Sequence, residues 1–216
     1  MSHLKRQEVP KKWPIERKGS VYVVSPNFNV GEGIPVLVVL RDMLKLAQNR
    51  NEVKKIIHSK QVFVNDKAAG DEKNNILLFD NISIPTMKKY YKMELSEKGK
   101  FYLEEIKESE SHKKIAKIIN KKTLKGKKTQ LNFGDGRNLL SDLKCSVNDS
   151  VIINFKDKKI EKGLPLKEKV KVIIFAGKHA GEKGEISEIN AESKTAKVNT
   201  KGKELNILIK QLMVTE

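Results

Sequence analysis

Residues 34–48 read IPVLVVLRDMLKLAQ, and this stretch decides the fold of the N-terminal half. Its apolar residues recur at the spacing of a helix, and Pro35 suits a first helical turn. An asparagine-rich break follows, in which Asn51 is a candidate N-cap for a second short helix. The inward-facing residues of that second helix would be Val53, Ile56 and Ile57.

A small hairpin is predicted after the two helices. The strand Gln61–Val64 ends at Asn65 and Asp66, a pair that is typical of a tight turn. A further strand at Ile82–Ile84 closes the unit before Pro85. Two helices, a turn and a hairpin therefore make one compact module over residues 34–90.

The residues before this module favour an extended basic arm. Residues 1–33 contain Pro10, Pro14 and Pro26, with one short strand predicted at Val21–Val24. In such an arm Trp13 would be available to stack on a base or to fill a groove. The alternative is a terminus that has no function and no fixed structure.

Charge is the strongest indication of the partner. The 216 residues include 44 Lys and Arg against 27 Asp and Glu, a formal net charge of +17. An excess of this size favours a polyanion, because neutralised phosphates release condensed counterions. Between Ser111 and Phe133 there are eight lysines and no acid. Their isoleucines, Ile115, Ile118 and Ile119, fit either a helical turn or a buried strand.

The C-terminal segment, residues 170–216, is predicted to be all-β. Apolar residues alternate over Val170–Ile174 and again at Ala196 and Val198, with four or five short strands in all. Three glycines punctuate the loop Gly177–Gly184. Short strands at this close spacing are typical of a small barrel.

The sequence lacks the motifs of enzymes and of metal sites. It contains no phosphate loop of the G-x-x-x-x-G-K-[ST] type and no G-x-S-x-G elbow. Cys145 is the one cysteine, so a core residue is favoured over a zinc ligand or a nucleophile. Gly134–Arg137 has the composition of a hairpin turn that displays Arg137. We expect no catalytic residue, cofactor, metal or small-molecule substrate.

The membrane is excluded as a partner by the hydropathy pattern. The longest apolar run, Ile34–Leu40, is far shorter than the ~18 residues that a spanning helix needs. The N-terminus is basic but has no apolar signal-peptide core. A cytoplasmic location is therefore expected.

Several stretches match one known family in order along nearly the whole chain. They are HLKR at 3–6, PKKW at 10–13, IPVLVVLRD at 34–42, EVKKI at 52–56, FDNISI at 79–84, QLNFGDGRN at 130–138, NDSV at 148–151 and GKHAGEKG at 177–184. In combination they resemble the e-type small-subunit ribosomal protein four family of archaea and eukaryotes. The chain ends soon after the last motif, which resembles the archaeal members.

This resemblance implies a multi-module α+β fold in four parts. The parts are a basic N-terminal arm at 1–33, an alpha-L RNA-binding module at 34–90, a central mostly-β domain at 91–169 and an SH3-like β-barrel with a KOW motif at 170–216. The implied function is that of a structural, ribosome-bound constituent of the small subunit. Its partners would be small-subunit rRNA and neighbouring ribosomal proteins.

Two other functions compete with this one. A transcription or translation factor with a KOW barrel would bind RNA transiently, but the alpha-L unit and the basic middle part argue against it. RNA-modifying enzymes also carry alpha-L modules, but they need a catalytic domain for which this chain has no room.

The expected RNA contacts are basic or stacking side chains from all four parts. They are His3, Lys5, Arg6, Lys11, Lys12 and Trp13 in the arm; Arg41, Lys45, Lys54, Lys55 and Lys60 in the alpha-L module; Lys121, Lys122, Lys125, Lys127, Lys128 and Arg137 in the central domain; and Lys178, His179 and Lys183 in the barrel. Arg41 and Lys45 would lie one turn apart on one helix face.

Two local features depart from the family's pattern. Lys60 stands where the family has glycine before the strand, and a left-handed backbone there would cost about 1 kcal/mol. In the following turn Asn65 and Asp66 stand where Asp-Gly is common. The loop Gly177–Gly184 could bind RNA, contact a protein or serve only as a tight turn. We further expect a valine at Gly184 to strain a backbone with positive φ.

Overall fold

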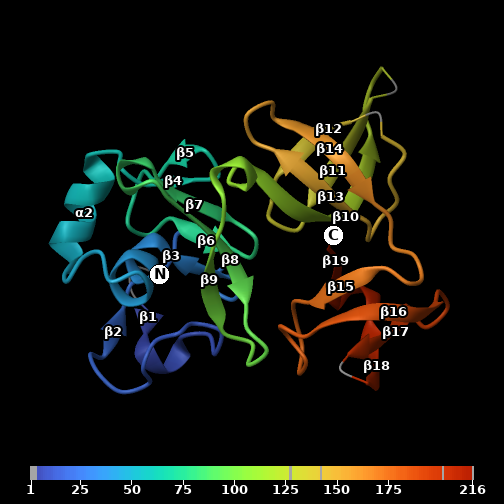
Figure 1. Ribbon diagram of the computed structural model, residues 1–216, viewed down its shortest axis with the longest axis horizontal. Helices are drawn as coiled ribbons and strands as arrows, with labels where there is room; N and C mark the ends of the chain where they lie inside the picture. The colour runs from blue at the N-terminus through green and yellow to red at the C-terminus, as the bar shows by residue number, and fades with distance from the viewer. Residues whose placement is uncertain (1–3, 127, 142, 201, 216) are drawn as a thin grey trace. The chain divides into compact units, whose positions relative to one another are not determined.

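The computed structural model describes residues 4–126, 128–141, 143–200 and 202–215 (Figure 1). The chain divides into two compact units between His112 and Lys113. Within the described residues the structure is mostly antiparallel sheet with few helices, which is a multi-module α+β fold. No helix in that part of the chain is long and apolar enough to cross a membrane.

The first helix of the N-terminal unit is shorter than the sequence pattern predicted. The helix α1 (Val36–Val38) continues directly into the π-helical turn η2 (Val39–Met43). Val36 to Leu40 are all buried, so this segment is apolar on every side and not amphipathic as the spacing predicted. It ends because Lys45 takes a left-handed backbone with φ of 54°.

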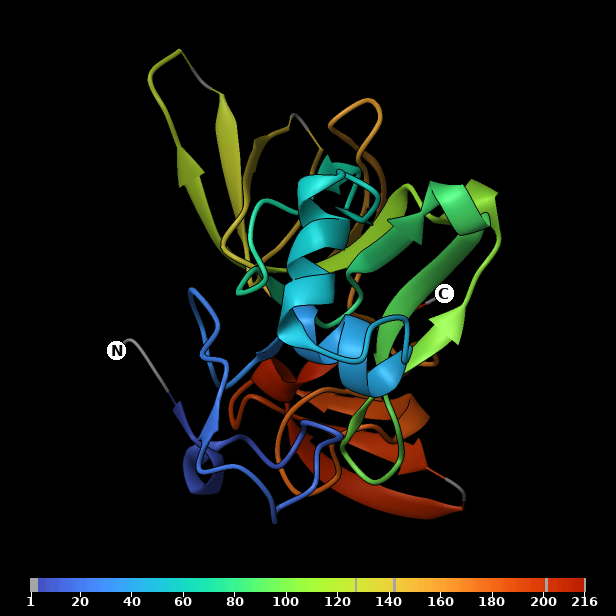
Figure 2. The same cartoon turned by 90° about the vertical axis from the view of Figure 1, so that its left-hand side faces the viewer.

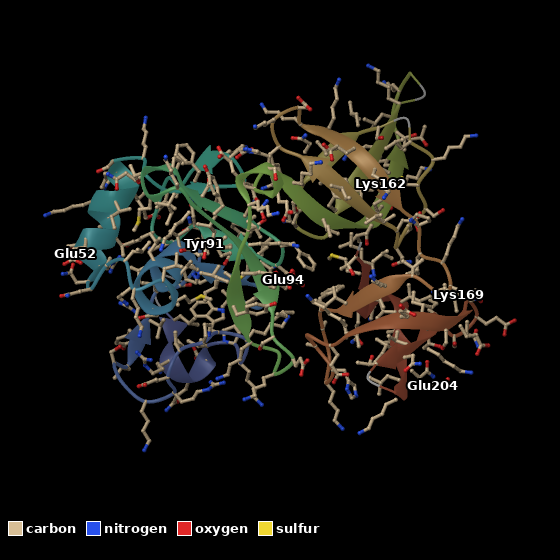
Figure 3. The ribbon with its side chains drawn as sticks, viewed as in Figure 1. Glu52, Tyr91, Glu94, Lys162, Lys169 and Glu204 are labelled. Carbon is tan, nitrogen blue, oxygen red and sulfur yellow. The ribbon has the colours of Figure 1, made fainter. Side chains whose placement is uncertain are left out.

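The second helix, α2 (Arg50–His58), begins two residues earlier than expected. Asn49, not Asn51, is its N-cap, and the Asn49 side chain accepts a hydrogen bond from Glu52 N at 3.0 Å. Glu52, labelled in Figure 3, accepts in return from Gln48 N at 2.7 Å. This reciprocal pair is a variant of the capping box, in which the acid accepts from the residue before the N-cap. It decides the start, because a cap at Asn51 would place Lys54 three residues on, where the box needs an acid or amide.

The end of α2 has a left-handed residue at Lys60, where the family has glycine. Lys60 has φ of 52°. Its N–H donates to Ile57 O, and the N–H of Gln61 donates to Ile56 O. This pair of hydrogen bonds is a Schellman motif, which places a left-handed residue directly after the helix.

The main sheet of the N-terminal unit has the strand order β5-β4-β7-β8-β9. Its strands are β4 (Phe63–Val64), β5 (Lys67–Ala68), β7 (Asn81–Ile84), β8 (Lys89–Leu95) and β9 (Phe101–Glu105). Asn65 and Asp66, both with positive φ, form the predicted tight turn between β4 and β5. The boundary expected after residue 90 falls inside β8, which pairs with β7 on one side and β9 on the other.

Residues 4–35 have fixed structure rather than the extended conformation expected of an arm. The strands β1 (Leu4–Lys5) and β2 (Tyr22–Val23) pair with each other, and the 3-10 turn η1 (Arg6–Glu8) follows β1. The strand β3 (Gly33–Pro35) pairs with β6 (Asn75–Leu77). Two more 3-10 turns, η3 (Pro85–Met87) and η4 (Glu108–Glu110), complete the unit.

The C-terminal unit begins with a sheet of order β12-β11-β10-β13-β14. Its strands are β10 (Lys113–Thr123), β11 (Thr129–Phe133), β12 (Asn138–Leu140), β13 (Ser150–Asn154) and β14 (Lys159–Leu164). The lysine-rich segment is thus a strand, because Ala116 and Ile118 pack with Leu131 and Val151 in a core. Cys145 lies in the same core, as expected, and burial raises the pKa of its thiol.

The last five strands form the sheet predicted for residues 170–216. Its order is β18-β17-β16-β15-β19, with bounds β15 (Lys171–Ile174), β16 (Lys183–Asn190), β17 (Thr195–Thr200), β18 (Lys203–Leu208) and β19 (Leu212–Val214). The 3-10 turn η5 (Ile209–Gln211) precedes β19. Ile152 and Leu164 of the first sheet belong to the same buried cluster as Val172 and Val198 of this one.

Gly184 is required for a different reason from the one expected. Positive φ occurs at Gly177 and Gly181 of the loop, at 93° and 97°, but not at Gly184. A Cβ at Gly184 would instead lie 2.5 Å from the backbone oxygen of Asn199 and 2.8 Å from Thr200 Oγ1. The expectation of strain from positive φ was therefore wrong, and close strand approach is the constraint.

We expect Gly184→Ala to lower the free energy of unfolding by about 2 kcal/mol, because the added methyl forces β16 away from β17. Urea unfolding and amide hydrogen exchange of β16 and β17 measure the effect. Gly31→Ala is the matched control, since nothing lies within 4 Å of a Cβ there. Equal stability of the two variants would contradict the steric account.

Candidate nucleic-acid interface

A lysine-rich hairpin is the most prominent basic feature of the C-terminal unit. The strand β10 pairs with β13 over Lys113–Lys117 and with β11 over Ile118–Thr123, with a bulge between Ile118 and Asn120. The outer part, residues 120–132, is the lysine arm. Its tip projects beyond the rest of its sheet in both views (Figures 1 and 2).

The lysine arm displays its cations on both faces. Successive residues of a strand point to opposite sides, so Lys121 and Lys122 face apart. The Lys121 ammonium donates to Cys145 O at 3.2 Å, while Lys122, Lys125 and Lys128 are exposed. Lys127 lies outside the described residues. No acid lies in the arm sequence to offset these charges.

The other lysines of the basic run have structural partners instead. Lys113 Nζ lies 2.9 Å from Glu161 Oε2. Lys114 is 2% exposed, and its Nζ donates to Asp135 Oδ2 at 2.8 Å. Burial alone would raise the pKa of Asp135, but the adjacent Lys114 ammonium outweighs this and lowers it. A continuous run of lysines in sequence is therefore divided between core and surface.

Arg137 is held in place by the turn that displays it. Its backbone N–H donates to Asp135 Oδ1 at 3.1 Å, and its Nε lies 3.6 Å from Asp135 Oδ2. The guanidinium lies 4.5 Å from the centroid of the Phe155 ring. Gly134–Arg137 is the turn between β11 and β12, as predicted.

Lys117 is buried where the two sheets of the C-terminal unit meet. Its Nζ donates to Ile209 O at 2.5 Å and to Leu212 O at 2.7 Å, and it lies 5.7 Å from the centre of the Phe175 ring. Burial lowers the pKa of this lysine to about 8. Its ammonium connects β10 to η5 and to the first residue of β19 rather than to solvent.

Trp13 does not have the stacking role expected from the sequence. Its side chain is 2% exposed, and Nε1 donates to Gly33 O at 2.8 Å. An indole in this position is a core residue and offers no face to a base. The sequence did not predict this burial, because the prolines on either side of Trp13 indicated an extended segment without a core.

The other RNA contacts predicted in residues 1–33 divide into structural and exposed groups. Arg6 donates through Nε and Nη2 to Ser20 and through Nη1 to Glu16 O, which closes the segment between β1 and β2. Burial lowers the pKa of Lys12. Lys5 and Lys11 are exposed, and His3 lies outside the described residues.

Arg41 and Lys45 do not share a helix face. Arg41 lies in η2 and pairs with Asp42 at 2.9 Å, whereas Lys45 lies beyond the helix end. The expected i, i+4 pair was wrong because the helix is too short to carry it. Lys55 and Lys60 are exposed, as is Lys54 on α2.

A hollow of about 330 Å³ lies beside α2 and was missed by the sequence reasoning. Arg50, Lys54 and His58 of α2 line it at one-turn intervals, opposite residues 70–73. The carboxylate of Glu72 is bound by Arg50. The spacing of four along one helix was a visible signal, but the contribution of Glu72 depends on tertiary structure.

The loop Gly177–Gly184 is held from within. His179 Nδ1 and Glu182 Oε1 are 2.9 Å apart, and Gly181 N donates to Ile174 O at 2.7 Å. Lys178 and Lys183 are exposed. Among the described residues no group of His, Cys, Asp and Glu side chains could hold a metal ion.

Known proteins resemble the chain over most of its length. The model of "Ribosomal family S4e" matches residues 87–160, and that of the "RS4NT (NUC023) domain" matches residues 2–28. Small ribosomal subunit protein eS4 of Methanocella arvoryzae is 37% identical over 198 residues, which cover 90% of this chain and 84% of that protein. The eS4 protein of Methanosphaera stadtmanae is 36% identical, covering 92% and 83%. The chain belongs to the eS4 family.

A solved structure shows the same fold. The crystal structure of 30S ribosomal protein S4e from Thermoplasma acidophilum superposes with a TM-score of 0.72. The match covers 85% of this chain and 94% of that one at 24% identity. The family predicted from sequence is confirmed by the eS4 relatives, so the chain is a structural protein of the small ribosomal subunit, not an enzyme. A transiently bound factor is not favoured.

The buried Lys117 predicts a pH dependence of stability. Between its pKa of about 8 in the folded chain and the ordinary 10.5, the unfolded chain binds a proton that the folded chain lacks. The free energy of unfolding should therefore rise with pH, by about 3 kcal/mol between pH 8 and 10.5. Urea unfolding of the wild-type chain and of Lys117→Met at several pH values measures this change in the free energy of unfolding. A difference between the two proteins that does not vary with pH would contradict it.

Proposed function

We propose that the chain binds small-subunit rRNA chiefly through the lysine arm. The observation that carries the proposal is a projecting hairpin with exposed Lys122, Lys125 and Lys128 and with no acid in it. Lysine ammonium groups bind phosphates as flexible point charges, so the arm follows an RNA backbone rather than reading base edges. Arg137, fixed by Asp135 and Phe155, adds a rigid cation at the base of the same sheet.

The finer module assignments belong to the same proposal. Residues 34–90 act as an alpha-L RNA-binding module, supported by two successive helical segments followed by the β4–β5 hairpin. Residues 170–216 act as an SH3-like barrel with a KOW motif, supported by five antiparallel strands and the Gly177–Gly184 loop. Residues 1–33 form the basic N-terminal segment and residues 91–169 the central domain, except that β8 and β9 pair within the alpha-L sheet.

The other displayed cations are secondary contacts in this proposal. They are Lys5, Lys11, Lys54, Lys55, Lys60, Lys178, His179 and Lys183, which are exposed or partly exposed. Arg6 is held by its hydrogen bonds to Ser20 and Glu16, and Lys12 is partly buried, so neither is counted among these contacts. Neighbouring ribosomal proteins and the RNA together surround the chain in the cytoplasmic ribosome.

Replacing Lys121, Lys122, Lys125 and Lys128 together by alanine should weaken RNA binding and flatten its salt dependence. Each lost phosphate contact changes the log–log salt slope by 0.7 to 0.9, so four change it by about 3. Filter binding to an archaeal small-subunit rRNA transcript over a range of KCl concentrations gives both quantities.

The matched control removes four exposed lysines from elsewhere in the same unit: Lys156, Lys158, Lys159 and Lys167. This variant has the same net charge as the arm variant. Its slope should change by less than half as much. Equal changes would show that net charge, and not the arm, determines binding.

A further inference from the structure

The hollow beside α2 has a buried carboxylate under exposed cations. The side chain of Glu72 is 2% exposed, whereas those of Arg50 and Lys54 are 53% and 46% exposed. Arg50 donates to Glu72 through both Nε and Nη2, and Lys54 Nζ lies 4.0 Å from Glu72 Oε1. The acid is thus beneath the cations, and the cations form the surface.

This arrangement is costly unless the partners are fixed. A buried carboxylate loses its hydration, and only well-placed charged donors compensate for that loss. The hydrogen bonds from Arg50 lower the pKa of Glu72 although burial opposes this, so Glu72 stays ionised. In return the two-point contact fixes the plane of the guanidinium. The hydrogen bonds to Glu72 do not use Nη1 of Arg50.

The donors that remain form a row. Arg50, Lys54 and His58 are four residues apart, which on a helix is a rise of ~6 Å at each step along one face. Lys73 lines the opposite wall of the hollow. Evenly spaced donors on a rigid helix fit the evenly spaced phosphates of a nucleic-acid backbone better than the irregular carboxylates of a flexible acidic peptide.

We propose that the α2 hollow is a phosphate-binding site for RNA in which Glu72 is a positioning residue that presents Arg50 and Lys54. The inference rests on the proposed rRNA-binding function, in which Lys54 is already a contact, and adds Arg50 as a phosphate ligand and Glu72 as the residue that positions both cations. The change in RNA affinity that it predicts is opposite to the usual one. Removing a negative charge from an RNA-binding surface ordinarily tightens binding, but removal of the Glu72 charge should weaken it.

The decisive variants are Glu72→Gln and Asp71→Asn in the full chain, with an archaeal small-subunit rRNA transcript as the probe. Both remove one negative charge from the lining of the same hollow, but only Glu72 is buried under Arg50. We expect Glu72→Gln to raise the Kd about tenfold, the equivalent of one charge-assisted contact. Asp71→Asn should leave the Kd unchanged or lower it.

A second variant guards against loss of folding in Glu72→Gln. Arg50→Lys keeps the charge and leaves Glu72 in place, but it cannot make the two-point contact. Its Kd should rise about threefold with an unchanged salt slope. Glu72 acts mainly through Arg50, because Lys54 Nζ is 4.0 Å away and Arg50 Nε only 2.9 Å. Arg50→Ala and the Arg50→Ala, Glu72→Gln double variant should therefore bind about equally weakly. Thermal unfolding of each variant accompanies the binding data.

The outcomes separate the two proposals. A shallow salt slope for the wild-type chain would remove the proposed function itself. A steep wild-type slope together with wild-type or tighter binding by Glu72→Gln and Arg50→Lys would overturn the positioning role alone. Polyglutamate serves as a second probe. If Glu72→Gln and Arg50→Lys lose binding to polyglutamate while their RNA binding stays intact, the hollow binds an acidic protein and the inference is overturned.

Discussion

The hydrogen bonds from the Lys117 ammonium to Ile209 O and Leu212 O join the two sheets of the C-terminal unit. Each of these sheets has only a small apolar core, and small cores bury too little surface to be stable alone. The sheets therefore share a buried cluster that includes Ile152 and Val172, and one strand, β10, supplies the lysine. The same strand continues into the lysine arm, so a single strand carries both the buried lysine that joins the sheets and the exposed lysines of the arm.

Acidic side chains hold cations in place in this chain. With a net charge of +17, unpaired cations at close range would destabilise the folded state by repulsion. Asp135 binds the buried Lys114, and Glu72 binds Arg50 from below. These acids are buried or nearly so, which leaves the outward positions to lysine. The fold thus separates charges that are needed for structure from charges that are available to a polyanion.

The sequence predicted the features that depend on local chemistry. The tight turn at Asn65–Asp66 was predicted because two residues of that type favour positive φ. Trp13 was misplaced because its burial depends on Gly33, twenty residues away. The N-cap at Asn49 was predictable from the sequence, because Glu52 stands three residues after it, but Asn51 was chosen instead. The function of Glu72 could not be predicted, because nothing in the sequence distinguishes this acid, which is buried, from its exposed neighbour Asp71.

Lysine at left-handed turns connects the stability of the chain to its charge. Eleven described non-glycine residues have positive φ, and six of them are lysines: Lys45, Lys60, Lys88, Lys158, Lys169 and Lys194. All six are exposed. Glycine would relieve about 1 kcal/mol of strain at each position, but it carries no charge. A chain that binds a polyanion recovers that loss through binding, because a ligand of the folded state stabilises it by mass action. Strain at these turns and display of cations at their tips are therefore two results of the same residue choice.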